Sequence, residues 1–540
     1  MSLDRQQRLW TTTCHQQFST IFSLLRLKNL TGQKKLFQLY QVPLYRPIKM
    51  ASTSFHDPEV VKFLDKAFEI IKEESLQKGT DNKYPVVDFQ QPKDLESLLD
   101  TEISSEPATH DQLLDALKKI IQYSVKTGHP HFMNQLYGGL DPYSQVGAWV
   151  TPTLNTNLHT YEVAPAFVIL ERYIYKKMLA LVGFEHGEGL FCPGGTASNI
   201  FALHLARFNK FPDVRKNGIY GMKPLRMYTS DMAHYSLKKG ALYLGLGTDN
   251  VVTINTDDRG HMITSELERC IKEDLEKGFV PMYVNATSGS TVLGSFDDLT
   301  AISEVCKTYN LWLHSDACWG GGTLLSRKHR HLMKGSHLCN SIAWNFHKFS
   351  GTPIQSSAFL LNDPSGNLME EANSTKAEYL FQPDKYYDAS YDIGDKTVQC
   401  GRSVDIVKLW MQWRGLGDSG MEAKIDLAYD KAHYLTEKLK ITEGFKMVLP
   451  EFECTNISFW YIPKRLRGKV EDDGWWQEVN DVAPKLKERM MKAGTLMIQY
   501  QALSTKGYAN FFRVVIVNQH VNYSDMDFVI EEFERLGHDL

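Results

Sequence analysis

The chain has 540 residues, of which 43% are hydrophobic, 11% aromatic and 23% charged, and this length predicts about three domains or one enzyme-sized core with appendages. The 60 Lys and Arg residues against 64 Asp and Glu residues give a net charge of −4, so the chain lacks the basic field of a nucleic-acid binder, and its aromatic content argues against intrinsic disorder. No apolar run approaches the ~18 residues needed to cross a bilayer, so we expect neither a nucleic-acid partner nor a transmembrane segment.

The first 49 residues form a separate compositional zone, with eight Lys and Arg residues against one acid, Asp4. An organellar transit peptide has this basic bias. The alternative is a disordered extension, which is supported by Met50, because that residue could itself be the start of translation. We therefore treat residues 1–56 as an extension that is either disordered or a targeting segment. Amphipathic stretches over residues 60–71 and 112–123 then predict a helical N-terminal segment over residues 57–128.

Residues 189–198, with the sequence GLFCPGGTAS, precede a helix that is predicted from the apolar spacing after residue 199. Backbone N–H groups of Gly194, Gly195 and Thr196 at the start of that helix would form a phosphate site. The segment is neither a Walker A loop, since GK[ST] is missing, nor a GxGxxG loop. Taken alone, it is better explained as an ordinary turn before a helix.

The middle of the chain alternates helices with short buried strands. Residues 265–277 predict a helix that Ser265 and Glu268 would start with a capping box and that Gly278 would end. Residues 279–286 and 311–317 predict buried strands. Helices between buried apolar strands indicate a mainly parallel sheet covered on both faces, so we expect an α/β fold.

Two segments near the end of this region carry candidate chemistry. Asp316 follows a buried strand and precedes small residues, a place where ligands gather in open α/β sheets, although a strand-end turn has the same pattern. Lys348 ends the segment SIAWNFHK among aromatic residues, where partial desolvation favours reaction of its amine with an aldehyde. By itself this lysine is not distinctive, because most lysines are solvated surface residues.

The C-terminal region differs in kind. Ser524 can cap a helix whose apolar face holds Met526, Val529, Ile530 and Phe533. We assign residues 415–540 to a smaller α+β domain and residues 129–414 to the large domain.

Eight cysteines are scattered without a CxxC pair, as is typical of a reduced intracellular protein. We therefore expect a cytoplasmic location, or a mitochondrial one if the basic extension is a transit peptide. The cluster of His329, His331 and His337 lacks organised carboxylate or thiolate ligands, so we expect no metal site.

The phosphate site, the strand-end acid and the lysine together provide what holds pyridoxal 5′-phosphate: an anion site, a counter-charge for the ring nitrogen and an aldehyde-trapping amine. The sequence resembles the group II pyridoxal-phosphate decarboxylases, in the branch that acts on glutamate, aspartate and cysteine sulfinate. The resemblance runs from about residue 58 to residue 540, and the last 16 residues are most similar to the cysteine sulfinate decarboxylases. It is carried in order by GHPHFMNQL at 128–136, TYEVAP at 160–165, PGGT at 193–196, SGSTVLGSFD at 288–297, the lysine segment at 341–348 and ANFFR at 509–513.

The resemblance implies a fold-type I enzyme and a role for each matching residue. Lys348 would bind the cofactor covalently, Asp316 would keep the ring nitrogen protonated, and His234 would stack on the ring. The remaining expected cofactor contacts are Ala317, Thr287, Gly195, Thr196, Asn345 and His347. Tyr387, on an expected mobile loop, would return a proton to the substrate carbon, whereas Gln135 and Arg513 would bind the substrate.

The implied activity is decarboxylation of cysteine sulfinate to hypotaurine, of aspartate to β-alanine, or of both, in a homodimer. Glutamate decarboxylation to GABA is the alternative within the same chemistry, because one methylene changes pocket fit by only ~1–3 kcal/mol. An alternative of another class is a catalytically impaired partner subunit, because Phe346 stands where the family generally has proline.

Overall fold

The computed structural model describes residues 54–99 and 101–540. The chain divides into two compact units, residues 1–61 and 62–540. The expected N-terminal extension, apart from residues 54–56, lies outside the described residues, so its targeting or disordered nature stays a prediction. Within the described ranges, no helix combines the length and the apolar character needed to span a membrane.

Helices dominate the beginning of the described chain, as the amphipathic stretches predicted. α2 (Pro58–Ile70) continues into a π-helical segment, η1 (Ile71–Gln77), and is followed by α3 (Pro92–Leu98) and α4 (His110–Tyr123). Thr109 caps α4 in a capping box with Gln112, because the two side chains satisfy each other's backbone N–H groups. α5 (Pro142–Leu154) leads from this segment into the large sheet.

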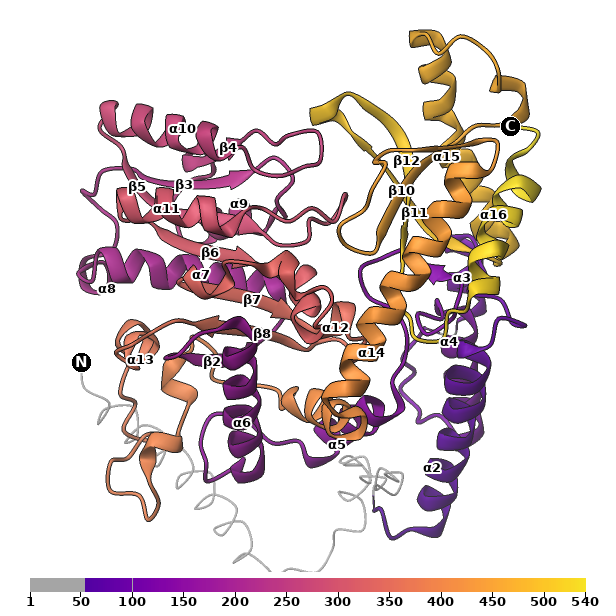
Figure 1. Cartoon of the computed structure of the whole chain (residues 1–540). Coiled ribbons are helices and arrows are strands. Elements are labelled where there is room, and N and C mark those ends of the chain that lie inside the picture. The colour runs from indigo at the N-terminus through magenta and orange to yellow at the C-terminus, as the bar shows by residue number, and fades with distance from the viewer. Residues whose placement is uncertain (1–53, 100) are drawn as a thin grey trace, which may run out of the picture. The chain divides into compact units, whose positions relative to one another are not determined.

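A seven-stranded sheet forms the centre of the second unit (Figure 1). Its order is β2-β8-β7-β6-β5-β3-β4, and the neighbours from β4 to β7 are all parallel. Only β8 runs against its neighbours β7 and β2. The mainly parallel sheet is therefore confirmed. The strands are β2 (Glu188–Cys192), β3 (Leu225–Ser230), β4 (Val251–Ile254), β5 (Val280–Thr287), β6 (Trp312–Asp316), β7 (Ser341–Asn345) and β8 (Ser357–Leu361).

Helices cover both faces of this sheet. α7 (Gly195–Lys210), α9 (Ser236–Tyr243) and α13 (Leu368–Asn373) share one apolar core, and α6 (Pro165–Val182), α10 (Thr264–Glu276) and α11 (Leu299–Tyr309) share the other. β8 illustrates the alternation, because Phe359 lies in the first core and Leu360 in the second. Each fully buried side chain of this size contributes about 1.5–3 kcal/mol, so a polar residue in either core would be costly. α8 (Val214–Asn217) follows α7.

Two predicted helix caps are wrong. α10 begins one residue earlier than expected, so Ile263 is its N-cap residue and Ser265 lies inside the first turn, where it cannot form the predicted capping box. α16 (Tyr523–Gly537) is capped by Asn522 together with Asp525 and not by Ser524. Asn522 precedes the helix directly, and an asparagine at this position is among the best N-caps. Gly278 has a positive φ one residue after the C-cap residue Lys277 of α10, as the predicted helix end requires.

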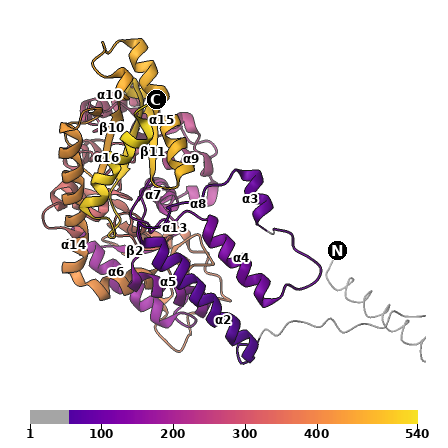
Figure 2. The ribbon, with the colours of Figure 1, turned by 90° about the vertical axis from the view of Figure 1, so that its right-hand side faces the viewer.

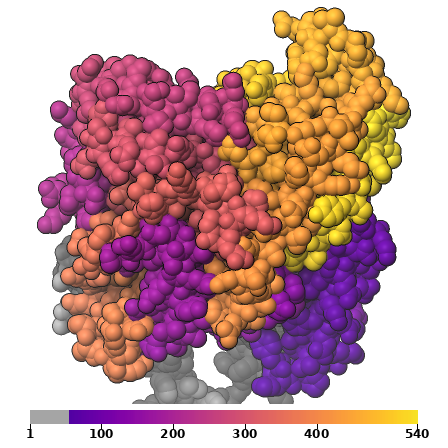
Figure 3. Space-filling model, in the orientation of Figure 1, coloured from indigo at the N-terminus to yellow at the C-terminus, as the bar shows by residue number. Residues whose placement is uncertain are grey.

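A second sheet of five strands lies in the C-terminal region, in the order β1-β11-β12-β10-β9. β1 (Phe132–Met133) joins it in parallel with β11 (Met497–Leu503), while β12 (Tyr508–Val515), β10 (Asn456–Tyr461) and β9 (Phe445–Met447) pair antiparallel. α15 (Asp473–Ala493) packs on this sheet, and α16 packs beside the long helix α14 (Ile406–Ile441), as Figure 2 shows. The smaller α+β part is confirmed, and Figure 3 shows it, in orange to yellow, against the region of the large sheet.

Candidate active site

The segments that follow β2, β3, β5, β6 and β7 meet around one cavity of about 200 Å³. In a parallel sheet the carboxyl ends of neighbouring strands lie at the same edge, so residues far apart in sequence converge there. Eight of the residues predicted from the sequence line this cavity: Gly195, Thr196, His234, Thr287, Asp316, Asn345, His347 and Lys348.

Hydrogen-bond donors gather where α7 begins. Gly195 and Thr196 occupy its first turn, where backbone N–H groups have no partner within the helix. Ser357 donates to Asn345 Oδ1 at 2.5 Å, which leaves Asn345 Nδ2 free to face Gly195. A Cβ atom at Gly195 would lie 2.4 Å from Cys318 Sγ, so only glycine fits there. The predicted contribution of the Gly194 amide is wrong, because that N–H donates to the carbonyl of Cys192.

Asp316 is a buried carboxylate at the end of β6 that accepts from Asn199 Nδ2 at 2.7 Å and from the Cys318 amide at 3.2 Å. Burial alone would raise the pKa of Asp316, but the Lys348 ammonium and Cys318 outweigh it and hold the pKa below its ordinary value. Burial lowers the pKa of His234, although Asp316 opposes this. The cavity therefore holds an ionised acid beside a neutral imidazole at neutral pH.

His347 and Thr287 add two further polar groups to the cavity. His347 Nδ1 lies 2.9 Å from the Ser356 carbonyl, and burial lowers the pKa of this imidazole to about 4. Thr287 donates its backbone N–H to Asp297, but its buried Oγ1 has no hydrogen-bond partner among the described residues. A buried hydroxyl without a partner is costly, so this atom indicates a place where a ligand is accepted.

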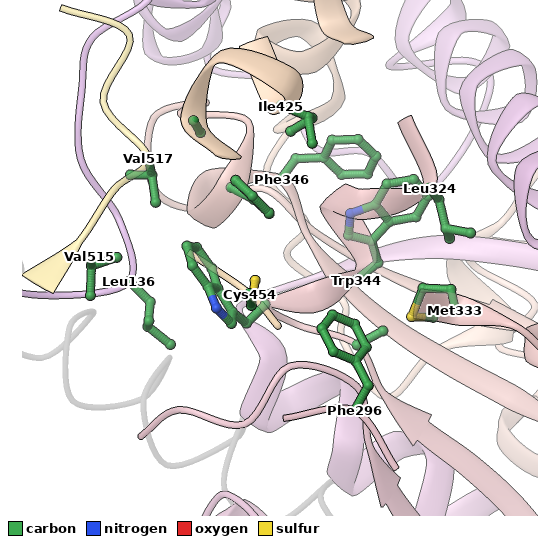
Figure 4. Packing of buried hydrophobic residues seen from close by; sticks show 14 of the residues in the cluster. Leu136, Phe296, Leu324, Met333, Trp344, Phe346, Ile425, Cys454, Val515 and Val517 are labelled. Carbon is green, nitrogen blue, oxygen red and sulfur yellow. The ribbon is translucent and has the colours of Figure 1, made fainter. Parts of the chain in front are cut away.

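Lys348 lies in the single helical turn α12 (Phe346–Phe349), which aromatic side chains enclose. Phe346 stacks on Trp344 with ring centres 4.4 Å apart, and Phe349 stacks on Trp319 at 4.8 Å. Figure 4 shows Phe346 and Trp344 among other buried apolar side chains. Phe346 is thus a fully buried core residue, and Lys348 still lines the cavity.

Arg513 does not line the cavity itself but is joined to its wall. The guanidinium donates to the carbonyl of Thr291, which lines the cavity, and to the carbonyl of Asn134 at 3.0 Å. Only 5% of Arg513 is exposed, its Nε has no partner, and no carboxylate pairs with it in the part of the chain that the structure describes. Burial lowers the pKa of Arg513 to about 10. Gln135, next to Asn134, is half-buried.

Tyr387 and Ala317 lie outside the set of residues that line the cavity. The Tyr387 hydroxyl donates to Asp392 at 2.9 Å and accepts from the Glu162 amide at 3.3 Å. Burial and Asp392 hold the pKa of Tyr387 above its ordinary value. Ala317 is fully buried directly after Asp316. The expected roles of both residues stay predictions.

The cavity also contains residues that the sequence reasoning missed: Asn199, Tyr235, Gly289, Thr291, Cys318 and Trp319. Most of them have a sequence signal in retrospect, because they adjoin a predicted residue or belong to the segment 288–297. Asn199 lies one helical turn after Gly195, so the 3.6-residue period of α7 places both toward the cavity. Among the described residues there is no group of three or more His, Cys, Asp or Glu side chains arranged to hold a metal ion.

The sequence around this cavity matches a known protein family. Residues 92–462 match the family model described as the pyridoxal-dependent decarboxylase conserved domain. The chain belongs to the pyridoxal-dependent decarboxylase family. The expected family is thus confirmed, the chain is a carboxy-lyase, and the cofactor of this family is pyridoxal 5′-phosphate.

Individual members of this decarboxylase family are similar over nearly the whole chain. Human cysteine sulfinic acid decarboxylase is 48% identical over 486 residues, which cover 90% of this chain and 98% of the human protein. Mouse acidic amino acid decarboxylase GADL1 is 44% identical over 524 residues, covering 97% of this chain and 94% of that protein.

Solved structures agree with the fold. The crystal structure of mouse CSAD has a TM-score of 0.87 and 47% identity, and the match covers 90% of this chain and 100% of the mouse chain. Oryza sativa TDC with PLP and tryptamine matches with a TM-score of 0.81 over 91% of this chain and 99% of the other, but at 19% identity, so it supports the fold alone.

The residues around the cavity fit the cofactor of this decarboxylase family. The start of α7 and Asn345 offer donors for an anion, Lys348 offers a primary amine, and Asp316 offers a carboxylate. The buried Thr287 hydroxyl has no hydrogen-bond partner among the residues that the structure describes, and a ligand in the site would provide one. Family membership favours an active enzyme over an impaired partner subunit.

Proposed function

We propose that this decarboxylase acts on a small acidic amino acid and converts cysteine sulfinate to hypotaurine, aspartate to β-alanine, or both. The observation that carries the proposal is Arg513, a buried cation without a carboxylate partner among the described residues, joined to the wall of the cavity. Such a cation is satisfied by an anionic substrate group. The similarity to human cysteine sulfinic acid decarboxylase and to mouse acidic amino acid decarboxylase GADL1 supports cysteine sulfinate and, more generally, an acidic amino acid as the substrate.

The proposed cofactor contacts follow from the chemistry of the residues that line the cavity. Gly195, Thr196, Asn345 and His347 would hold the phosphate, Asp316 would face the ring nitrogen, and His234 would stack on the ring. When bound, pyridoxal 5′-phosphate supplies a ring that accepts the electrons left as carbon dioxide departs. Lys348 would hold the cofactor through its amine, at the aldehyde carbon. Thr287 and Ala317 would complete the contacts around the ring.

Substrate orientation would depend on Arg513 and Gln135. The planar guanidinium can bind a carboxylate through two parallel hydrogen bonds, which fixes direction as well as position. Its present bonds to the carbonyls of Thr291 and Asn134 hold the guanidinium between the two sheets. Gln135 follows Asn134 directly, so it would reach the same substrate.

The first prediction concerns substrate choice. Purified full-length chain with added pyridoxal 5′-phosphate should release carbon dioxide from cysteine sulfinate, aspartate or both, with kcat/KM about 10-fold or more above that for glutamate. This expectation follows from the similarity to a decarboxylase named for cysteine sulfinate, and a difference of one methylene is worth ~1–3 kcal/mol. Arg513→Met should lower kcat/KM by about 10- to 100-fold, since a charge-assisted hydrogen bond is lost. Carbon dioxide release is measured for each substrate separately.

Arg269→Met is the matched control, because Arg269 is an exposed residue of α10 that pairs with Glu266 and Glu273. It should leave all rates unchanged. Preference for glutamate would support the GABA alternative, and absence of carbon dioxide from all three substrates would contradict the proposed function.

We further propose a homodimer in which Tyr387 of one copy completes the cavity of the other. The Tyr387 hydroxyl is bonded to Asp392 and is not part of the cavity wall of its own chain. A second copy offers a route by which it would reach the substrate carbon. A tyrosine hydroxyl there can deliver a proton once water is excluded, and the raised pKa keeps Tyr387 protonated at neutral pH.

The second prediction tests this arrangement with mixed dimers. Lys348→Ala and Tyr387→Phe chains carrying different tags are co-expressed, and the mixed dimer is isolated by both tags. One of its two sites would then hold an intact Lys348 and an intact Tyr387, so amine formation should reach about half the wild-type rate. Each variant alone should form little amine, and Tyr387→Phe should divert product toward aldehyde. An inactive mixed dimer would place Tyr387 and Lys348 in the same chain, and failure to isolate one would contradict the dimer.

Location and domain limits remain part of the proposal. We propose a cytoplasmic protein, because the seven cysteines that the structure describes are all free thiols. A mitochondrial location is the alternative if residues 1–49 act as a transit peptide. We also propose domain limits near residues 128 and 414, since the large sheet lies between Glu188 and Leu361 and four strands of the second sheet follow residue 444.

A further inference from the structure

A continuous series of buried side-chain hydrogen bonds lies behind the cavity and ends on Asp316. Trp312 Nε1 donates to Ser341 Oγ at 2.9 Å, and Ser341 Oγ lies 2.8 Å from His314 Nδ1. His314 Nε2 lies 3.0 Å from Asn199 Oδ1, and Asn199 Nδ2 donates to Asp316 Oδ2 at 2.7 Å. All five residues are buried, so water does not compete for these bonds.

The chemistry of the two end groups fixes the direction of every bond in this series. An indole N–H can only donate, and an ionised carboxylate can only accept. Asn199 must therefore present Nδ2 to Asp316, and its Oδ1 accepts from His314 Nε2. Burial lowers the pKa of His314 to about 4, so the ring is neutral and its bare Nδ1 accepts the Ser341 hydroxyl proton. Each proton is thus directed toward Asp316.

Asn199 also joins Asp316 to the loop that carries His234. The second hydrogen of Asn199 Nδ2 is donated to Ser236 Oγ at 2.8 Å, and the Ser236 backbone N–H donates to His234 Nδ1 at 3.3 Å. One amide group therefore fixes the acid and the imidazole relative to each other. The same helix, α7, supplies the phosphate site in its first turn and Asn199 one turn later.

We propose that Asn199 is the positioning residue for the cofactor ring: it fixes the orientation of the Asp316 carboxylate, so that the free lone pairs of the carboxylate are directed at the ring nitrogen. This inference rests on the proposed role of Asp316. The Cys318 amide occupies Oδ1 of the carboxylate and Asn199 occupies Oδ2, so the carboxylate cannot turn away from the cavity. Without Asn199, the carboxylate would lose a charge-assisted hydrogen bond and His314 Nε2–H would lose its acceptor.

The test compares two ligands and needs no turnover. Apo-protein is titrated with pyridoxal 5′-phosphate and with the analogue in which carbon replaces the ring nitrogen, and Kd is measured from absorbance. Wild-type protein should prefer the natural cofactor. Asn199→Leu should weaken the natural cofactor by about 10- to 100-fold, the loss expected for a hydrogen bond to a charge, and the analogue by less than about 3-fold. Equal weakening of both ligands would overturn the proposal.

Two further variants keep the test decisive. Asn199→Asp retains the side-chain volume but sets a second carboxylate against Asp316, so preference for the nitrogen-containing ring should fall as in Asn199→Leu, and an unchanged preference would overturn the proposal. Thr436→Val removes another buried hydrogen bond, on α14, and should change neither Kd. If wild-type protein binds both ligands equally, the proposed role of Asp316 fails. If wild-type protein prefers the natural cofactor and the Asn199 variants keep this preference, only the inference about Asn199 fails.

Discussion

Lys348→Ala should abolish both the visible absorbance of lysine-linked cofactor and decarboxylation, with a loss of at least about 10⁴-fold in kcat. Its amine is the group that forms the covalent bond in the proposed chemistry, and removal of a residue that acts covalently typically costs this much. Lys348 lies in the one-turn helix α12 at the cavity. Absorbance spectra and carbon dioxide release from the purified variant provide the measurement.

Lys277→Ala is the matched control for this variant. Lys277 follows α10 and is largely exposed, with an ion pair to Glu273. It should keep the wild-type spectrum and rate. A Lys348→Ala protein that retains full absorbance and full activity would transfer the covalent role to another amine, and the proposed mechanism would then be wrong.

Acid should destabilise the folded chain steeply between pH 6.5 and pH 4. Burial lowers the pKa of His129, His204, His314 and His347 to about 4 in the folded state, whereas an unfolded histidine titrates near ~6.5. Below about pH 6.5 these histidines therefore bind protons in the unfolded chain but stay neutral in the folded chain, so the unfolded state is favoured. At pH 4 each histidine lowers the free energy of unfolding by up to about 3 kcal/mol. The four together lower it by on the order of 10 kcal/mol, which is comparable to the whole stability of a typical domain.

His204→Gln separates this effect from other acid effects. His204 lies on α7 and accepts from Arg207 at 3.3 Å, away from the cavity. The variant should lose about 3 kcal/mol less between pH 7 and pH 4 than wild-type protein, as measured by urea unfolding at a series of pH values. His261 has the opposite effect: Glu453 raises its pKa, so protonation of His261 stabilises the folded chain as the pH falls. An identical pH dependence in both proteins would contradict the assignment.

Much of the fold follows from local sequence patterns. The predicted strand at residues 279–286 corresponds to β5, and the predicted helix at residues 265–277 corresponds to α10, each within one residue at either end. Such elements can be predicted from hydrophobic periodicity, because the apolar residues must lie on the buried face of a helix or on one or both buried faces of a strand. The cap at Ser524 failed because the neighbouring Asn522 can also cap a helix and does so with Asp525. The cap at Ser265 failed because α10 starts one residue earlier, after Ile263, which provides no side-chain cap.

The site was predictable where one segment carries its own chemistry, as in residues 341–348. Asn199 was not, since its importance depends on Asp316 and His314, more than 100 residues away, and a single asparagine in a helix has no distinctive pattern. Strand β1 was also missed, because two residues give no periodicity, and its place in the second sheet depends on pairing with β11. Long-range pairing is decided by tertiary packing that a local pattern does not contain.

The carbonyl of Thr291 connects the loop after β5 of the large sheet to two strands of the smaller sheet. It accepts hydrogen bonds from Arg513 and from Asn456, both on strands of the smaller sheet, while Asn456 also accepts from Trp319 beside the cavity. These hydrogen bonds connect the two sheets, so a hinge motion that separates the sheets would break several buried hydrogen bonds at once. Substrate entry should therefore proceed by local loop displacement, and the radius of gyration of the protein should stay constant when ligand binds.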